Sequence, residues 1–181
     1  ELLVNMLEWT KFEMKRMDYK PINFDIRDIC FNEVVPLFNT IAQKKQITIR
    51  ECDVKLDSYI VYSDIRMISA VLRNLISNAL KFSSEGKEVV ICFVDLDDKI
   101  KVVVKDCGVG IPEDKVKLLL SGKSFTTLGT KGEQGSGIGM DLINKMLHQC
   151  NSELNIKSVV GEGSEFSFEL KKINDDKCNC C

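Results

Sequence analysis

One helical segment limits the possible folds of this chain more than any other part of its sequence. Between Asp64 and Phe82, apolar residues recur at intervals of three and four and form one continuous face of an amphipathic helix. These residues are Ile65, Ile68, Val71, Leu72, Leu75, Ile76, Ala79 and Phe82. Asn74, Asn78 and Lys81 fall together on another side, at spacings of four and three. The segment therefore predicts a helix that packs through one side and carries polar groups on another.

Strand and helix patterns alternate around this helix. Strands are predicted over residues 22–26, 46–52, 59–62, 88–96, 99–106, 154–159 and 166–172. Further helices are predicted over residues 28–45, 113–120 and 137–150. Asp28 is the expected N-cap of the first of these, and its expected apolar side consists of Ile29, Val34, Leu37, Phe38 and Ile41. This order of elements predicts a two-layer α/β sandwich in which helices cover one face of a mixed sheet.

Two further segments, residues 1–17 and 121–137, suggest more specific structures. Residues 1–17 have helical periodicity, which fits either a core-facing helix or the end of a long dimerisation helix. The second interpretation is favoured because the pattern begins at the first residue without a cap, and Lys20-Pro21 ends it. Residues 121–137 contain five Gly, three Thr and three Ser, so a long loop is expected, which in a compact domain is commonly a functional lid.

The composition excludes several classes of protein. The 181 residues are 44% hydrophobic and 29% charged, as in a typical soluble globular protein. With 25 basic and 27 acidic residues the net charge is −2, which argues against a nucleic-acid-binding domain. No apolar run reaches the roughly 20 residues that span a bilayer, and no signal peptide is recognised, so a cytoplasmic location is expected.

The chain has eight cysteines, and the five that precede the C-terminal tail include no C-x-x-C pair, so neither a zinc site nor a thioredoxin-type motif is indicated there. Five of them are expected to be small buried hydrophobes in a reducing compartment: Cys30, Cys52, Cys92, Cys107 and Cys150. The terminal cluster of Cys178, Cys180 and Cys181 could bind a soft metal, although a frayed polar tail is the favoured interpretation.

Two glycine-containing segments carry residues suited to nucleotide binding. In the segment 106–112, Asp106 ends a strand and is followed by Gly108 and Gly110. Its carboxylate could accept a hydrogen bond from an exocyclic amine while the glycines admit a flat ring, but a plain strand-ending turn explains the pattern equally well. In the segment 135–139, a glycine-rich turn enters a helix, where backbone N–H groups and the helix dipole favour an anion, although glycines also serve ordinary turns.

The asparagine pair on the 64–82 helix also has two interpretations. An amide oxygen suits Mg²⁺ that is held mostly by water and phosphate, whereas asparagines often bond to neighbouring backbone. Because Asn74 and Asn78 lower helix propensity, a functional role is favoured. Gly122-Lys123-Ser124 resembles the end of a P-loop, but Lys117 stands where the first glycine is needed and the preceding segment is helical, so a P-loop is excluded.

Taken in order, four segments resemble the sequence boxes of sensor histidine kinases. Residues 73–82 (Arg-Asn-Leu-Ile-Ser-Asn-Ala-Leu-Lys-Phe) resemble the N-box, and residues 106–110 (Asp-Cys-Gly-Val-Gly) the G1 box. Residues 124–127 (Ser-Phe-Thr-Thr) resemble the F-box, and residues 135–139 (Gly-Ser-Gly-Ile-Gly) the G2 box. The resemblance extends over residues 20–173 and implies the Bergerat ATP-binding fold that is shared with DNA gyrase, mismatch-repair ATPases and heat-shock chaperones.

The resemblance implies a role for each matching position. Asp106 would receive the adenine amino group, Asn78 would bind Mg²⁺, and Asn74 and Lys81 would be the catalytic residues, with Lys81 reaching phosphate. Residues 112–136 would form the ATP lid, in which Lys123 or Lys131 could add positive charge. The implied ATP-binding residues are Asn74, Asn78, Lys81, Phe82, Asp106, Gly108, Gly110, Ile111, Phe125, Thr126, Thr127, Gly135, Ser136, Gly137, Ile138, Gly139, Met140 and Ser164, the last where family members often have Thr.

The implied function is transfer of the γ-phosphate of Mg-ATP to a histidine on a dimerisation helix, for relay to a response regulator. Hydrolytic members of the superfamily carry Glu at the position of Asn74, and an amide cannot take a proton from water. His148, the only histidine, lies outside the boxes, so the acceptor is expected upstream, in a kinase that is a homodimer. The chain would divide into the helix end 1–19, the catalytic domain 20–173 and the Cys-rich tail 174–181.

Two alternatives remain on the same fold. A degenerate module could bind nucleotide only to scaffold a partner, but all four boxes are intact. An anti-sigma-factor-like serine kinase is also conceivable, but the N-terminal helix and its Pro break favour the histidine kinase.

Overall fold

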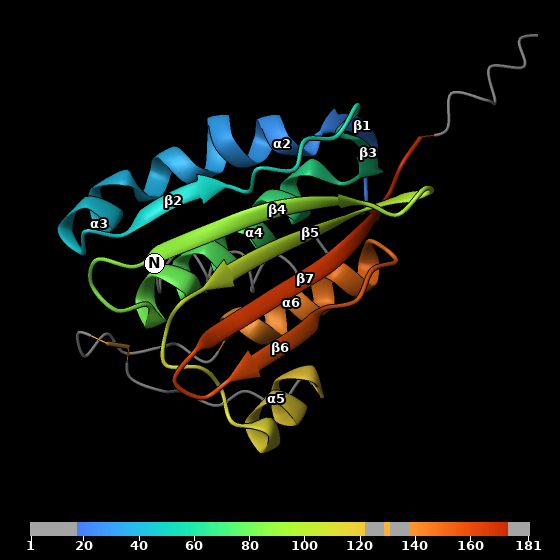
Figure 1. Ribbon diagram of the computed structural model, residues 1–181. Helices are drawn as coiled ribbons and strands as arrows, with labels where there is room; N and C mark the ends of the chain where they lie inside the picture. The colour runs from blue at the N-terminus through green and yellow to red at the C-terminus, as the bar shows by residue number, and fades with distance from the viewer. Residues whose placement is uncertain (1–17, 122–128, 131–137, 174–181) are drawn as a thin grey trace, which may run out of the picture.

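The computed structural model describes residues 18–121, 129–130 and 138–173 (Figure 1). The predicted dimerisation helix, the Cys-rich tail and most of the 121–137 loop therefore lie outside the described residues. The main sheet has the strand order β2(Thr48–Glu51), β4(Glu88–Asp95), β5(Lys99–Asp106), β7(Gly163–Lys171) and β6(Asn155–Val159). Only β2 and β4 are parallel among these pairs, so the sheet is mixed, as predicted.

A smaller sheet pairs β1(Ile22–Asp25) with β3(Ile60–Ser63) antiparallel. Two long helices, α4(Ile65–Phe82) and α6(Ile138–Gln149), lie together behind the main sheet in the view of Figure 1, and α5(Glu113–Leu120) lies beside β6. The predicted two-layer α/β sandwich is confirmed. No helix among the described residues is long and apolar enough to cross a membrane.

Helix α4 forms the centre of the core, as its apolar periodicity predicts. Its N-cap is Asp64, whose buried carboxylate accepts hydrogen bonds from the backbone N–H groups of Arg66 and Met67. The residues buried along it face the inward side chains of the sheet, where Val89, Ile91 and Phe93 alternate along β4 with partly exposed neighbours. Apolar burial on both elements thus fixes how the helix lies on the sheet.

The helix predicted over residues 28–45 differs from the prediction in two ways. It begins at Ile26, because Asp25 rather than Asp28 is the cap and accepts a hydrogen bond from the backbone N–H of Asp28. It is also irregular, since Pro36 has no N–H to donate within the helix. Its successive pieces are α2(Ile26–Asp28), the π-helical η1(Ile29–Val34), the 3-10 helical η2(Val35–Phe38) and α3(Asn39–Lys44).

These irregular turns change the angular spacing of the side chains, so the apolar side predicted for an ideal helix is only partly correct. Ile29 and Val34 are buried, whereas Leu37 and Ile41 are 62% and 47% exposed. The prediction that five cysteines are buried was wrong for three of them. Cys30 and Cys150 are buried, whereas Cys52, Cys92 and Cys107 are half-buried.

Candidate functional site

Helix α4 carries both of the predicted asparagines. Asn74 is buried, and its Nδ2 donates a 2.9 Å hydrogen bond to the carbonyl of Ala70 one turn earlier, which leaves Oδ1 as the side-chain atom that can still accept. Asn78 is half-buried, and its Nδ2 lies 3.6 Å from the sulfur of Met140 at the start of α6. Asn74 therefore makes the hydrogen bond to neighbouring backbone that was the alternative to a functional role. Asn78 marks a point of contact between α4 and α6.

Asp106 ends β5 with a carboxylate that is almost entirely removed from solvent. The residue is 3% exposed, and its Oδ1 accepts hydrogen bonds from the backbone N–H groups of Gly108 and Ser164, at 2.9 and 3.2 Å. No donor among the described residues reaches Oδ2. Burial raises the pKa of this carboxyl from 3.8 to about 6, although the two backbone hydrogen bonds act in the opposite direction. One oxygen is therefore fixed and the other remains able to accept.

The loop after Asp106 sits directly on the C-terminal end of α4. The backbone N–H of Val109 donates to the carbonyl of Phe82, and a Cβ at Gly108 would lie 2.3 Å from that same oxygen. Only glycine fits there, because any side chain would displace the helix end or the loop. The carboxylate of Asp106 is thus held close to the last turn of α4, and Asn78 lies one turn before Phe82, about 6 Å along the helix axis.

The β6–β7 hairpin holds the loop from its other side. The hydroxyl of Ser158 accepts a 2.7 Å hydrogen bond from the backbone N–H of Ile111 and lies 3.0 Å from the hydroxyl of Ser164. Gly110 has a φ of +70°, and a Cβ there would lie 2.1 Å from the carbonyl oxygen of Val159. Ser158 is a positioning residue that the sequence did not reveal, since it stands in a strand outside the four boxes.

A buried lysine that the sequence analysis missed caps the C-terminus of α4. Lys45 is 4% exposed, and its ammonium donates to the carbonyls of Leu80 and Lys81 at 2.8 and 3.0 Å and to the hydroxyl of Thr130 at 2.9 Å. The backbone N–H of Thr130 also donates to the carbonyl of Lys81. A cation at this position offsets the partial negative charge of the helix end, which would otherwise repel a phosphate nearby.

Other predicted site residues are placed only in part. The ammonium of Lys81 lies 5.1 Å from the ring centroid of Phe82. Ile138, Gly139 and Met140 form the first turn of α6. The predicted residues that lie outside the described part of the chain are Phe125, Thr126, Thr127, Gly135, Ser136 and Gly137.

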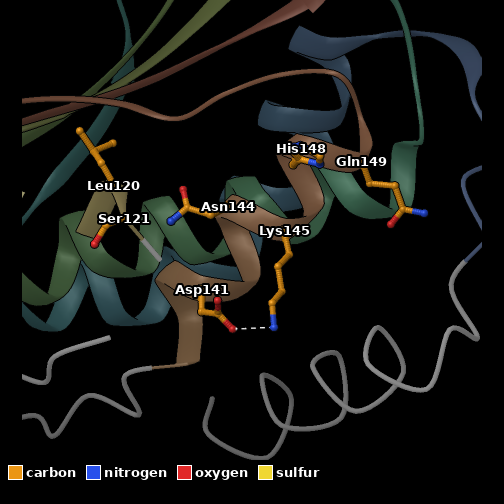
Figure 2. Close-up of a pocket in the computed structure, with 7 residues that line it drawn as sticks. All are labelled: Leu120, Ser121, Asp141, Asn144, Lys145, His148 and Gln149. Atoms are coloured by element: carbon orange, nitrogen blue, oxygen red, sulfur yellow. Dashed lines mark ion pairs between the residues drawn. The ribbon is translucent and has the colours of Figure 1, made fainter. Parts of the chain in front are cut away.

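A cleft of about 530 Å³ lies elsewhere, between α5 and α6, and none of the predicted ATP-binding residues lines it (Figure 2). An ion pair of 3.0 Å between Lys145 and Asp141 crosses its edge. His148 is exposed on this face of α6. The lining residues are Leu120, Ser121, Asp141, Asn144, Lys145, His148 and Gln149.

Comparisons with known proteins identify a family that matches most of this chain. Residues 63–174 match the family described as histidine kinase-, DNA gyrase B-, and HSP90-like ATPase. The chain is 34% identical over 139 residues to the adaptive-response sensory kinase SasA of Crocosphaera subtropica. The matched region covers 76% of this chain and 36% of that protein. This chain spans 36%, 10% and 44% of the length of the first three curated relatives. Each relative is therefore more than twice as long as the region that it shares with this chain.

Solved structures give the same result for the fold. The catalytic domain of the histidine kinase ThkA superposes with a TM-score of 0.71 at 26% identity, covering 86% of this chain and 97% of that one. Full-length ShkA, solved in complex with AMPPNP, superposes with a TM-score of 0.76 over 95% of this chain and 36% of its own. Its identity is 20%, so this second likeness concerns the fold alone.

Proposed function

We propose that this chain is the ATP-binding catalytic domain of a sensor histidine kinase. The chain belongs to the family described as histidine kinase-, DNA gyrase B-, and HSP90-like ATPase. The observation that carries the proposal is the half-satisfied carboxylate of Asp106. Its Oδ1 is held by two backbone N–H groups, while no donor among the described residues reaches Oδ2. The amino group of adenine is a donor of the required kind.

Recognition of adenine by Asp106 would depend on the ionised carboxylate. A buried charge is costly unless it is hydrogen-bonded, so a third donor from the base would lower the pKa of Asp106 and stabilise the bound state. Gly108 and Gly110 let the loop pack closely against the carbonyls of Phe82 and Val159, which fixes the position of the carboxylate that would face the ring. Ile111, which packs against the core, and Ser164 would complete the walls of this pocket.

The phosphate groups would extend along α4 toward the first turn of α6. Lys81 would pair with phosphate, and the N–H groups at the start of α6 would face the same anion. Asn78 fits Mg²⁺, because its Nδ2 is directed at the sulfur of Met140 and its Oδ1 is the hard ligand left over. No group of three or more acidic, His or Cys side chains that could hold a metal ion exists among residues 18–121, 129–130 and 138–173, so the phosphates themselves would supply further oxygens. Bound Mg²⁺ would supply neutralisation of the triphosphate charge.

Transfer rather than hydrolysis suits this site. Asn74 holds the position from which a general base would act on water, and its amide is committed to the carbonyl of Ala70. Phosphoryl transfer depends mainly on positioning and charge neutralisation, which Asp106, Lys81 and the α6 N-terminus would provide.

The partners and boundaries are part of the same proposal. Residues 1–19 would be the end of the dimerisation and phosphoacceptor helix, 20–173 the catalytic domain and 174–181 a tail. ThkA has also been solved in complex with the response regulator protein TrrA, which supports a response regulator as the final acceptor here. We place the domain in the cytoplasm, where ATP is available, alone or as part of a membrane-bound sensor.

The test combines this chain, γ-labelled Mg-ATP and a separately produced dimer of phosphoacceptor helices from the same kinase. We expect label on a histidine, in a bond that is stable in alkali and broken by acid. Label on a serine of another protein would instead favour the anti-sigma-factor-like kinase, and ATP binding without any transfer would favour the scaffold module. Neither alternative is favoured by the relatives, which are sensor kinases.

A further inference from the structure

Helices α4 and α6 cover one face of the main sheet (Figure 1), and two cysteines in neighbouring strands, Cys52 and Cys92, are directed to its other face. Cys92 stands in β4 between Ile91 and Phe93, which are both buried in the core, so its side chain points to the other face. The parallel register pairs Glu51 with Ile91, and the ladder continues with a 2.9 Å hydrogen bond from the backbone N–H of Cys52 to the carbonyl of Ile91. Cys52 is therefore the direct neighbour of Cys92.

The spacing of this pair suits a covalent bond between the sulfurs. Neighbouring strands lie about 4.8 Å apart, and the Cα atoms of disulfide-bonded cysteines are usually about 4.4 to 6.8 Å apart. Cys52 lies one residue beyond the end of β2, an edge strand, so its backbone can adjust without disturbing the ladder. Both cysteines are free thiols and neither is fully buried.

We propose that Cys52 and Cys92 form a reversible disulfide by exchange with a low-molecular-weight disulfide such as oxidised glutathione. The Cys52 thiolate attacks one sulfur of glutathione disulfide and releases one glutathione, which takes up the proton that Cys52 lost. The Cys92 sulfur loses its proton, attacks the Cys52 sulfur and releases the second glutathione as a thiol. Two protein thiols thus lose two electrons and two protons, and one glutathione disulfide gains them.

The electrostatic surroundings indicate which sulfur reacts first. Burial, and then the adjacent Cys52 sulfur, raise the pKa of Cys92 to about 12, so its thiol stays protonated at neutral pH. Glu165 acts in the same direction, and Arg50 opposes it. Cys52 lies just beyond the end of the edge strand β2, where an external disulfide can reach it, so Cys52 is the residue that attacks the external disulfide, and Cys92 resolves the mixed disulfide.

The bond would close a loop from residue 52 to residue 92 that contains the whole of α4. Closing such a loop restricts the unfolded chain, so the oxidised form should melt at a higher temperature than the reduced form. This inference does not depend on the proposed function, because neither cysteine touches Asp106, Asn78 or Lys81 in any contact described above.

The experiment uses the reduced 181-residue chain, incubated with oxidised glutathione, alkylated and cleaved with trypsin. The tryptic peptides 51–55 and 88–99 each contain one cysteine, so a linked pair is unambiguous in mass spectrometry. We expect this linked peptide to form in the wild type and in Cys107→Ser, to disappear on treatment with dithiothreitol, and to be absent in Cys52→Ser and Cys92→Ser. Peptides that carry only glutathione, or links from either cysteine to other cysteines, would overturn the proposal.

A second measurement does not depend on any variant. Phenylarsine oxide binds two neighbouring thiols together, and one equivalent should protect both peptides of the wild-type chain from alkylation. If the two thiols are alkylated independently in its presence, they are not close enough to bond and the proposal is wrong.

Discussion

Replacing Asp106 with Asn should stabilise the empty protein and weaken its binding of ATP. The substitution keeps an oxygen that can accept from Gly108 and Ser164, so the loop geometry should survive. It removes a buried charge, and it places an amide N–H₂ where the account requires an acceptor for the adenine amine. The two effects have opposite signs, which separates a binding role from a purely structural one.

The size of the stabilisation follows from the pKa of Asp106. A rise in its pKa from 3.8 to about 6 on folding corresponds to about 3 kcal/mol of stability that is lost when the carboxyl ionises. Because the folded-state pKa is the higher one, this stability is fully present below about pH 4 and is lost as the pH rises through 6. The Asp106→Asn variant should therefore match the wild type at pH 4 and exceed it by about 1–3 kcal/mol at pH 7.

Urea unfolding between pH 4 and 8 measures the stability difference, and calorimetry measures the ATP affinity. Loss of a charged hydrogen bond, with two donors left facing each other, predicts an affinity about 30- to 150-fold lower. Asp98→Asn makes the same chemical change in the exposed β4–β5 turn and should alter neither quantity. A variant that binds ATP as tightly as the wild type, or that loses stability at pH 7, would refute the reasoning.

Three further variants test the rest of the site. Asn78→Ala should abolish the gain in ATP affinity that Mg²⁺ gives in the wild type, measured by calorimetry with Mg²⁺ and with EDTA; a preserved gain would remove Asn78 as a ligand. Gly108→Ala should remove ATP binding because its Cβ would meet the Phe82 carbonyl at 2.3 Å, whereas Gly86→Ala, with no atom within 4 Å, should only cost about 1 kcal/mol from its positive φ. Lys45→Met should lower the unfolding free energy by about 2 kcal/mol in urea, because it leaves the carbonyl of Leu80 without its donor and removes one hydrogen bond from the carbonyl of Lys81, while the adjacent exposed Lys44→Met should have almost no effect. Equal stability of the two lysine variants would argue against the cap.

The sequence predicted α4, β4, β5 and α5 because each has a strong local signal. In α4 the apolar period, the Asp64 cap and the polar face all agree, and such agreement between levels makes an element predictable. Asp106 was equally well explained by a turn, and only the structure adds its burial, its two backbone donors and the contact of Gly108 with Phe82.

The features that the sequence did not predict depend on contacts between distant residues. Lys45 was predicted only as the last residue of the 28–45 helix, but it is buried because its ammonium donates to the carbonyl of Leu80 at the end of α4, 35 residues later in the chain. Ser158 becomes part of the site only when the β6–β7 hairpin lies beside the loop. The 28–45 helix was assigned a regular period, although Pro36 prevents one.

Asp106 is expected to recognise the amino group of adenine. The most direct test compares the affinities of the wild type and of Asp106→Asn for ATP and for inosine triphosphate, which carries a carbonyl oxygen where ATP has the amine. If Asp106 accepts a hydrogen bond from the adenine amine, the wild type should prefer ATP by about 30-fold or more, and the variant should lose or reverse this preference. An unchanged preference in the variant, or equal affinity of the wild type for both nucleotides, would contradict it.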